Sequence, residues 1–522
     1  MTTDVLVVGA GPTGLVIALW LTTLGVRVRI IDKTAEPGTT SRALVVQART
    51  LELYDHIGLA RDVIARGRRF VAANLWVRGA KAGRIAFGDF GTDLSPFPYA
   101  LIFPQDEHER VLIARLAARG VVVERGTTLI DFGDVGDHVS ARLCRADGTE
   151  EHCEAAYVAG CDGAHSTVRE ILGIGFPGGT YEHLFYVADV EASGAVMDGE
   201  LHAALDDANF LAVFPMKSAQ GARLVGMVRW DVEHQRDTLG WDDVSVGVFA
   251  RLGIDVHRVN WFWMYHVHHR VASRFGKGRA FLLGDAAHVH SPVGGQGMNT
   301  GIGDAVNLAW KLAAVLQHQA PSAVLSTYEP ERIGFARRLV ATTDRAFTLV
   351  TSGGRLARIV RVHVVPRVLP VLFRSRRVRR FMFRTVSQTR VRYRESPLSA
   401  GRAGGVHGGD RLPWVGVNFG PLSALAWQAH VYGEPSGEVR KACASRSLVL
   451  HVFPWFQPMS RAGLARDALY LIRPDGYVAL ADRGASAAVL ERYLDTRGIT
   501  LRPAGQGFSR PHDPLASGLH LH

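Results

Sequence analysis

Three glycine-rich segments hold most of the residues whose types and spacing could do chemistry. VVGAGPTG stands near the start of the chain, CDGAHSTVR occupies 161–169, and FLLGDAAHVHSPVGGQGMNTG occupies 281–301. Glycines at the entrance to a helix leave backbone N–H groups uncovered, and these groups attract phosphate together with the helix dipole. The pattern predicts a dinucleotide site assembled from segments that are far apart in the sequence.

The first segment has the order strand, turn and helix. An apolar run at 5–8 enters the turn, and an amphipathic helix leaves it. Gly9 would allow the tight turn, Gly11 would let a pyrophosphate approach the backbone, and Gly14 would let the helix pack closely on the sheet. The second strand, at 26–31, leads to Asp32, whose carboxylate is placed to accept a hydrogen bond from a ribose hydroxyl.

The third segment distinguishes a flavin from a nicotinamide cofactor. A strand at 280–283 leads to Gly284 and Asp285, and the loop at 294–297 opens a long helix. A nicotinamide dehydrogenase has no need of this second helix N-terminus. FAD does, because it carries pyrophosphate oxygens at one end and a ring that becomes negative on reduction at the other. The sequence therefore favours FAD.

Taken together, in this order and at this separation, the three segments resemble the flavin-dependent aromatic hydroxylases of the p-hydroxybenzoate hydroxylase type. The resemblance implies a monooxygenase that uses O2 and takes electrons from NADPH or NADH. It also implies that reduced FAD forms a C4a-hydroperoxide, which transfers one oxygen atom to a phenolic or polycyclic aromatic substrate.

The resemblance assigns roles to single residues as well. Arg42 would lie beside the flavin ring, and the Pro292 carbonyl would lie near its reactive side, so these two are the candidate catalytic groups. Asp162 and Arg169 belong to the middle segment, which could serve the cofactor or be only a turn and helix cap. The predicted cofactor-binding set is Gly9, Gly11, Gly14, Asp32, Lys33, Arg42, Gln105, Asp162, Asp285, Pro292, Gly295, Gly297, Met298 and Asn299.

The positions of these segments predict an α/β fold with three parts. A discontinuous Rossmann-like FAD-binding domain would comprise 1–175 and 266–395 and end in an Arg-rich helical segment. An antiparallel substrate sheet would be inserted at 176–265, with part of 70–100. Residues 396–522 resemble the thioredoxin-like domain of phenol hydroxylases and bacterial polyketide hydroxylases, without the CxxC that dithiol chemistry needs.

Substrate contacts are harder to predict. Phe214, Met216 and Met227 fall on strand-like runs of the insert and could line an aromatic pocket, although such residues are more often core. If the substrate is a phenol, a histidine could assist its deprotonation. The candidates for that step are His266, His268 and His290.

The formal net charge of +11 comes from one segment. Residues 355–394 contain 13 arginines and no acidic residue, and without them 47 basic residues would face 49 acidic ones. We therefore expect no nucleic-acid site. The arginines alternate with apolar residues at roughly helical spacing, which favours an amphipathic linker helix and leaves peripheral contact with an anionic membrane open.

The remaining composition favours a cytoplasmic enzyme without an integral membrane segment. The longest apolar stretches are interrupted by Arg or Pro, and the four cysteines show neither a metal-ligand spacing nor a disulfide framework. No metal site is predicted, and a homodimer is one open assembly.

Several other activities fit the same cofactor segments. Baeyer-Villiger insertion and a non-oxygenase FAD reductase are the main alternatives, and an inactive assembly module is a third. A halogenase is disfavoured because Met264 and Tyr265 follow the Trp261–Trp263 run in place of Ile-Pro.

Overall fold

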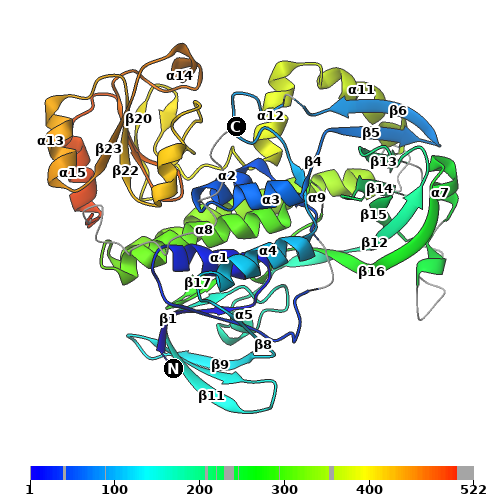
Figure 1. Cartoon of the computed structure of the whole chain (residues 1–522), viewed down its shortest axis with the longest axis horizontal. Helices are drawn as coiled ribbons and strands as arrows, with labels where there is room; N and C mark the ends of the chain where they lie inside the picture. The colour runs from blue at the N-terminus through cyan, green and yellow to red at the C-terminus, as the bar shows by residue number, and fades with distance from the viewer. Residues whose placement is uncertain are drawn as a thin grey trace, which may run out of the picture.

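The computed structural model describes residues 2–38, 43–88, 90–205, 210–218, 220–228, 240–244, 246–292, 294–351 and 358–501. Three large sheets and the helices between them make up this part of the chain (Figure 1). The predicted α/β class, with a Rossmann-like parallel sheet beside a second, mostly antiparallel sheet, is confirmed. Arg42 lies outside the described residues.

The first sheet is the parallel nucleotide-binding sheet. It has the order β17 (Gly276–Lys277), β18 (Ala280–Leu282), β11 (Glu150–Gly160), β1 (Thr2–Val8), β2 (Val28–Asp32) and β8 (Val123–Arg125), and β10 (Val139–Cys144) and β9 (Thr128–Asp134) extend it from β11. β1 pairs in parallel with both β2 and β11, and β11 pairs in parallel with β18. All three glycine-rich segments therefore leave the sheet at one edge, because parallel strands end on the same side.

Helices pack tightly against this sheet. α1 (Pro12–Thr23) and α8 (Gly297–Leu316) lie side by side across the centre of the molecule, with α4 (Gln105–Ala117) next to α1 (Figure 1). Every residue of α1 from Gly14 to Leu21 is buried, since the helix is enclosed by sheet and helices. Four further helices lie between or beside the sheets: α2 (Ala48–His56), α3 (Ala60–Arg66), α5 (Thr167–Ile171) and α9 (Tyr328–Thr351).

The second sheet is mixed and mostly antiparallel. Its order is β19 (His288–Val289), β16 (Asp255–Val271), β12 (Gly178–Ser193), β15 (Gly221–Met227), β14 (Phe210–Pro215), β13 (Leu201–Leu205), β5 (Ala72–Val77) and β6 (Ala80–Ala86). β5 and β6 come from the N-terminal part of the chain, and β16 continues past the expected boundary to Val271. α7 (Val246–Leu252) covers one face through an apolar cluster that includes Val248 and Leu224.

The C-terminal part forms the third sheet. Its order is β21 (Val406–His407), β20 (Ala400–Ala403), β25 (Val478–Asp482), β24 (Leu469–Ile472), β22 (Gln428–Tyr432) and β23 (Val449–Phe453), flanked by α13 (Gly437–Ser445), α14 (Gln457–Arg461) and α15 (Ala487–Thr496). Cys443 is buried, and desolvation raises the pKa of its thiol to about 11. A neutral, buried thiol without a partner cysteine cannot perform dithiol exchange.

The Arg-rich segment is helical where the structure describes it. A π-helical turn at Val360–Val364 runs into α11 (Val365–Leu372), and α12 (Arg376–Val386) follows. Their inner side chains, among them Val365, Leu369 and Phe373, pack against a cluster that contains Ile85 of β6. The segment is thereby attached to the substrate sheet.

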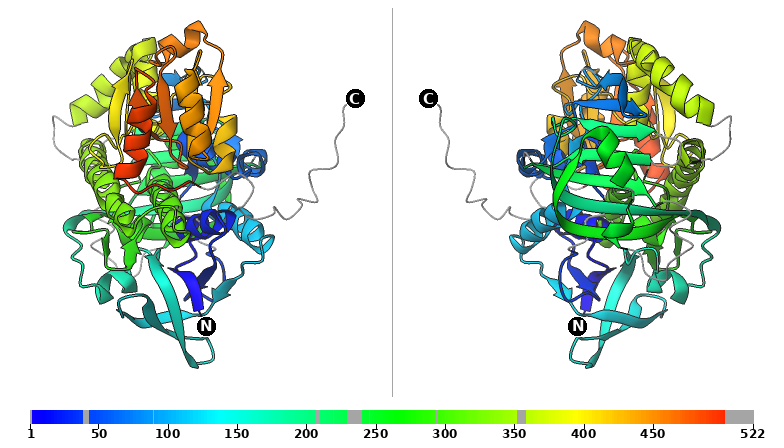
Figure 2. Two further views of the ribbon diagram at one scale, coloured as in Figure 1. Left: turned by 90° about the vertical axis from the view of Figure 1, so that its left-hand side faces the viewer. Right: turned by 90° about the vertical axis from the view of Figure 1, so that its right-hand side faces the viewer.

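Short elements connect these layers. β3 (Val45–Val46), β7 (Leu101–Ile102) and β4 (Arg68–Arg69) form a small three-stranded sheet, and 3₁₀ turns occur at Trp241–Asp243, Gly284–Ala286, Ser322–Thr327 and Gly420–Ala424. In the right-hand view of Figure 2, the strands of the substrate sheet, drawn in green, run across the middle of the molecule above the N-terminal strand. None of the described helices combines the length and the apolarity that crossing a bilayer requires.

Buried histidines make the stability of this fold depend on pH. Desolvation lowers the pKa of His56, His108 and His430 from 6.5 to about 3 each. Between those two values the unfolded chain binds more protons than the folded one. Acidification from about pH 6.5 to about pH 5 therefore lowers the free energy of unfolding, and the slope rises toward about 1.4 kcal/mol per pH unit for each histidine.

Urea denaturation across this pH range measures the effect. His108→Gln keeps an acceptor for the Tyr54 hydroxyl. It should reduce the slope of the free energy of unfolding against pH by the contribution of one histidine. His257→Gln, at a site where the side chain is 47% exposed, should leave the slope unchanged. A slope that is the same in all three proteins contradicts the interpretation.

Candidate active site

The first glycine turn is shaped by close backbone contacts. Gly9 has φ +99°, and a Cβ on it would lie 2.4 Å from the Cys161 carbonyl oxygen. A Cβ on Gly14 would lie 1.9 Å from the Gly9 carbonyl oxygen, so these two positions require glycine. Gly11, the N-cap of α1, has φ −74°, and a Cβ there would meet nothing within 4 Å. Gly11 therefore faces open space, where its missing side chain leaves room for a ligand.

The start of α8 is packed against the start of α1 in the same way. Gly284 has φ +57°, and a Cβ on it would lie 2.6 Å from Thr13 Oγ1. A Cβ on Gly301 would lie 2.3 Å from the same hydroxyl oxygen. Thr13 is thus enclosed by two glycines of the third segment, and the two helix N-termini converge. Their dipoles add at one place, which suits a polyanionic group.

The residues around the two helix N-termini are suited to bind FAD. The open space at Gly11 and the converging helices would take the pyrophosphate. Asp285, in the turn between β18 and α8, is exposed, as a carboxylate that receives ribityl hydroxyls must be. The lining thus offers N–H groups to the phosphates and a carboxylate to the hydroxyls.

Asp32 stands at the end of β2, where the sequence places it. Its Oδ2 accepts a hydrogen bond of 2.7 Å from the Ala10 N–H, and its Oδ1 accepts bonds from the N–H and the hydroxyl of Thr34. The carboxylate therefore also fixes the glycine turn, a role that sequence reasoning did not anticipate. Lys33 beside it is exposed.

Gln105 fixes the chain that follows Arg42. Its backbone N–H donates to the Ala43 carbonyl, and its side-chain Oε1 accepts from the Ala43 N–H at 3.1 Å. Its amide nitrogen donates to Glu109 at 2.8 Å, and burial raises the pKa of that carboxyl. Gln105 therefore positions the backbone at Ala43.

The middle segment joins the first and third segments. Asp162 lies against Gly9, since the Gly9 Cβ would come within 2.9 Å of the Asp162 Cα, and its Oδ2 accepts from the Val168 N–H. Its Oδ1 has no hydrogen-bond partner among the described residues, and desolvation raises the pKa of the carboxyl. The buried Arg169 donates to the carbonyls of Ala286 and Ala164, so it holds the Asp285 turn in place.

The buried residue Asp304 stabilises the turn at Gly284. Sequence reasoning did not single it out. Asp304 accepts from the Gly284 N–H at 3.1 Å, pairs with His288 at 2.7 Å and with Arg332 at 2.6 Å. The attraction of Arg332 and His288 outweighs burial and lowers the pKa of the Asp304 carboxyl. Its only sequence signal is an acidic residue on the apolar face of a helix.

The loop before α8 is held by side-chain amides. Asn299 is saturated: its Oδ1 accepts from the Gln47 N–H and the Thr50 hydroxyl, and its Nδ2 donates to the carbonyls of Val45 and Gly295. Only its backbone is left for a cofactor. Pro292 is exposed, and its carbonyl accepts from the Gly295 N–H at 3.0 Å, which closes a turn.

The remaining loop positions are less constrained by side chains. Gly295 has φ +60°, and its Cβ would lie 2.9 Å from that of Val45, so the loop approaches the 43–47 strand closely. Gly297 begins α8, and Met298 is half-buried against the main core.

The end of the Arg-rich segment reaches this loop. Gln388, at φ +61°, donates through Nε2 to Gln296 Oε1 at 2.8 Å and to the Thr300 hydroxyl at 2.9 Å. Gln296 donates in turn to the carbonyls of Gly294 and Val386. The segment at 355–394 therefore supports the flavin loop directly, which neither its charge nor its periodicity predicted.

One row of the substrate sheet faces the FAD domain. Trp261, Asp189, Arg223 and Phe214 are neighbours across β16, β12, β15 and β14. Arg223 is 1% exposed, pairs with both Asp189 oxygens at 2.7 and 2.6 Å, and donates to the Ala43 carbonyl at 3.4 Å. Sequence reasoning missed this pair. The sequence feature that could have indicated it is the arginine, Arg223, within an otherwise apolar strand.

The predicted substrate residues divide by position. Phe214 and Met227 are half-buried on this face, and Met227 packs in a small aromatic cluster with Phe185. Met216 lies just after β14, where its carbonyl accepts from Arg68 at 3.3 Å. Strand alternation places all three on the face away from α7.

Of the three candidate histidines, only His290 lies near the flavin loop. Its Nδ1 donates to the Ser291 carbonyl at 2.8 Å, and its Nε2 lies 3.8 Å from the place of a Gly297 Cβ. Burial lowers the pKa of His290 to about 4, so the ring is neutral near pH 7. His266 and His268 lie on the opposite face of β16 from Tyr265.

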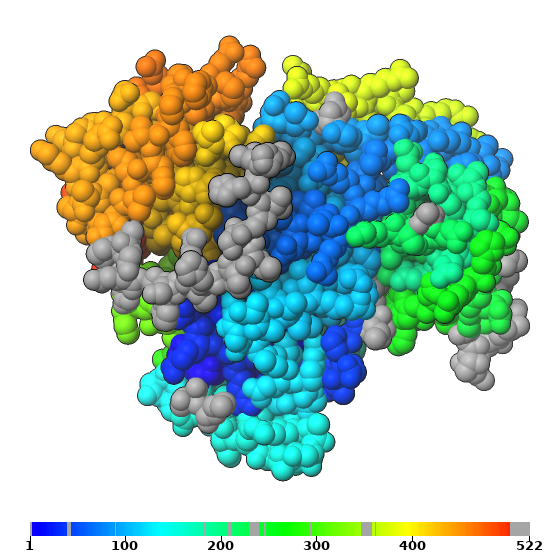
Figure 3. Space-filling model, viewed as in Figure 1, coloured from blue at the N-terminus to red at the C-terminus, as the bar shows by residue number. Residues whose placement is uncertain are grey.

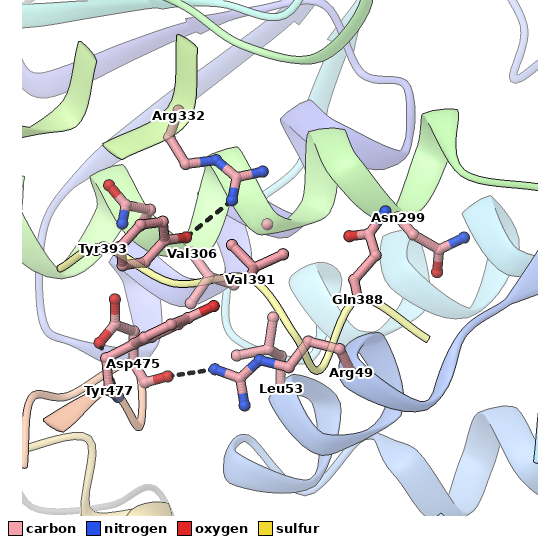
Figure 4. Close-up of a pocket in the computed structure, with 12 residues that line it drawn as sticks. Arg49, Leu53, Asn299, Val306, Arg332, Gln388, Val391, Tyr393, Asp475 and Tyr477 are labelled. Carbon is pink, nitrogen blue, oxygen red and sulfur yellow. Dashed lines mark hydrogen bonds between the residues drawn. The ribbon is translucent and has the colours of Figure 1, made fainter. Parts of the chain in front are cut away.

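The C-terminal domain closes the far side of α8. A small pocket is lined by residues of α2, α8, α9, the 388–393 segment and the turn Asp475–Tyr477 (Figure 4). Arg332 donates to the Tyr393 hydroxyl, and Arg49 donates to the Asp475 carbonyl. These groups bind one another, so we interpret the pocket as part of the domain interface and not as the substrate site.

The fold and this site define a flavoprotein monooxygenase of the aromatic hydroxylase class. The FAD binding domain family matches residues 2–343. The chain is 33% identical over 559 residues to the 6-methylpretetramide 4-monooxygenase of Streptomyces rimosus, covering 97% of this chain and 96% of that one. It is 33% identical over 395 residues to the rifampicin monooxygenase of Streptomyces venezuelae, covering 75% and 79%.

A solved structure agrees. The anhydrotetracycline hydroxylase OxyS from Streptomyces rimosus superposes with a TM-score of 0.77 at 28% identity, covering 96% of this chain and 100% of that one. The chain belongs to the FAD binding domain family, and it is an FAD-dependent aromatic monooxygenase. The predicted class and cofactor are thereby confirmed.

Substitutions at Gly11 and Gly14 should distinguish an effect on FAD binding from an effect on folding. Gly11→Ala adds a methyl group into open space at an ordinary φ, so the protein should fold with an unchanged melting temperature. The methyl group would stand where the pyrophosphate approaches, and we expect FAD affinity to fall about tenfold or more.

Gly14→Ala is the matched comparison. Its Cβ would overlap the Gly9 carbonyl, so this variant should lose stability. FAD titration by fluorescence and thermal melting of the apoprotein measure both effects. Equal FAD affinity in wild type and Gly11→Ala would contradict the assignment of the pyrophosphate site.

Proposed function

We propose that this enzyme uses O2 and NADPH or NADH to hydroxylate a phenolic ring of a polycyclic aromatic compound. The observation that carries the proposal is the face of the substrate sheet on which Phe214 and Trp261 flank the buried Arg223–Asp189 pair, whose arginine reaches the Ala43 carbonyl. Relatives at 33% identity are named for 6-methylpretetramide and rifampicin, which supports a large polycyclic substrate.

FAD, when bound, supplies the electron transfer from the reductant and the activation of O2. The chain's own residues bind and orient it. The N-terminus of α1 would hold the pyrophosphate, Asp285 the ribityl chain, Asp32 the ribose, and the backbone at 295–299, where α8 begins, the ring. Arg42 and the Pro292 carbonyl remain the candidates for groups beside the reacting part of the ring.

Arg223 is a positioning residue in this proposal. Its guanidinium holds Ala43 from the substrate side, while Gln105 holds the same residue from the FAD side. The residue that follows Arg42 is therefore fixed between the two domains. A fixed backbone here keeps substrate and cofactor in one relative geometry, which oxygen transfer requires.

His290 is the candidate for a hydrogen bond to the hydroxyl of a phenolic substrate. Its ring is neutral, its Nδ1 is committed to the Ser291 carbonyl, and its Nε2 has no hydrogen-bond partner among the described residues. A neutral imidazole with an uncommitted nitrogen can accept a hydrogen bond from a phenol hydroxyl, whereas the burial that lowers the pKa of His290 to about 4 disfavours complete proton transfer.

A cytoplasmic location fits the reductant and the cysteines. The four cysteines are free, and three of them are buried. A reducing compartment that contains NADPH and NADH keeps thiols in this state.

The activity is tested with the FAD-loaded protein under labelled O2. Oxidation of NADPH and of NADH is followed with simple phenols and with polycyclic phenols, and products are analysed by mass spectrometry. A polycyclic phenol should accelerate oxidation and gain one labelled oxygen on a ring carbon. Ring insertion would instead indicate a Baeyer-Villiger reaction, and oxidation of the reductant without labelled product would contradict the proposal.

Replacing Arg223 tests the positioning role. Arg223→Lys keeps the charge but loses the paired contact with Asp189, and we expect kcat/KM to fall about tenfold or more while FAD affinity stays within about threefold. The fraction of reductant oxidised without hydroxylation should rise. Arg84→Lys, which alters an exposed pair with Glu200 on the same sheet, is the control and should leave both quantities unchanged.

A further inference from the structure

The helices of the Arg-rich segment expose apolar side chains. The exposed large apolar residues between 359 and 381 are 42–57% exposed: Ile359, Val364, Val368, Val371, Leu372 and Phe381. Val364, Val368, Val371 and Leu372 follow helical spacing, so they form one stripe. We call these six residues and the arginines among them the α11–α12 surface.

α11 is apolar on its inner face as well. Val365, Leu369 and Phe373 pack against the cluster of β5 and β6, and Pro366 and Pro370 lie against Gly83. A helix on the surface of a globular protein normally turns a polar face to water. The outer stripe of α11 is therefore unexplained by packing within the described part of the chain.

Positive charge surrounds this stripe. Arg358, Arg367, Arg374, Arg376 and Arg377 are all exposed, and 355–394 contains no acidic residue. Arg376 makes one long contact, 3.3 Å, with the exposed Asp93. The surface thus combines exposed apolar side chains with a run of exposed arginines at the edge of the molecule, in the yellow-green region at the upper right of Figure 3.

We propose that the α11–α12 surface docks on an anionic lipid bilayer. The apolar stripe would enter the boundary between headgroups and acyl chains, and the arginines would contact the lipid phosphates. The complementarity of charge selects this occupant. A second copy related by twofold symmetry would bring the same arginines together, and nucleic acid would leave the apolar stripe in water.

Docking here would place the substrate sheet near the membrane. The inner side chains of α11 pack on β6, the edge strand of that sheet. An apolar polycyclic compound concentrates in bilayers, so a docked enzyme would meet it at a higher local concentration. This consequence rests on the proposed function, whereas the docking itself does not.

Vesicle flotation of the FAD-loaded protein tests the docking directly. Wild type should float with vesicles that contain phosphatidylglycerol and remain unbound with pure phosphatidylcholine vesicles. High salt should reverse the binding, because screening weakens the attraction of arginine to headgroups. Failure to bind phosphatidylglycerol vesicles at low salt would overturn the proposal.

Two variants test the surface itself. Arg374→Gln with Arg377→Gln should lower the vesicle partition coefficient about tenfold or more. Val368→Ser with Val371→Ser should lower it by a similar factor, since both side chains would leave the apolar interface. The four side chains are exposed, so all variants should keep the wild-type melting temperature.

The matched control is Arg440→Gln with Arg461→Gln, which removes the same charge from the exposed surface of the C-terminal domain. It should bind vesicles as wild type does. Equal binding by all variants would overturn the assignment of the surface. Sedimentation velocity tests the remaining alternative. If the 56.9 kDa chain is a dimer, and Val368→Ser with Val371→Ser converts it to a monomer, the surface binds a second copy and the membrane proposal is rejected.

Discussion

The close approach of two helix N-termini is the constraint on which this enzyme depends. α1 and α8 can meet because Gly14 carries no Cβ against the Gly9 carbonyl, and Gly284 and Gly301 carry none against Thr13. The positive ends of two helix dipoles lie together there, an arrangement that an anion between them stabilises. The packing of the core therefore depends on glycines that also shape the proposed FAD site.

Buried charges extend this constraint to the third domain. Asp304 fixes the Gly284 turn and pairs with Arg332, whose neighbour Glu331 pairs with Arg473 of the C-terminal hairpin at 2.8 Å. Breaking such a pair leaves an uncompensated charge, which costs about 3–5 kcal/mol. The C-terminal domain, although it lacks a dithiol, thus helps to define where α9 and the flavin turn lie.

The Arg-rich segment contacts both the loop before α8 and the substrate sheet. Its end supplies Gln388, which holds Gln296 and so the flavin loop, while its helices cover the edge of the substrate sheet. One segment therefore supports the cofactor site, the substrate domain and, in our proposal, the contact with a bilayer. The net charge of the protein is a property of this segment, and its location explains why charge alone said little about function.

The sequence by itself determined the cofactor, the class of reaction and the Rossmann-like unit, because glycine turns, strand ends and helix starts are local features. Gly9, Gly14 and Asp285 could be recognised in this way. The Arg223–Asp189 pair and the contacts of Asp304 were decided only by the tertiary structure. These contacts join strands and helices far apart in the chain, and periodicity says which face a residue occupies but not which partner it meets there.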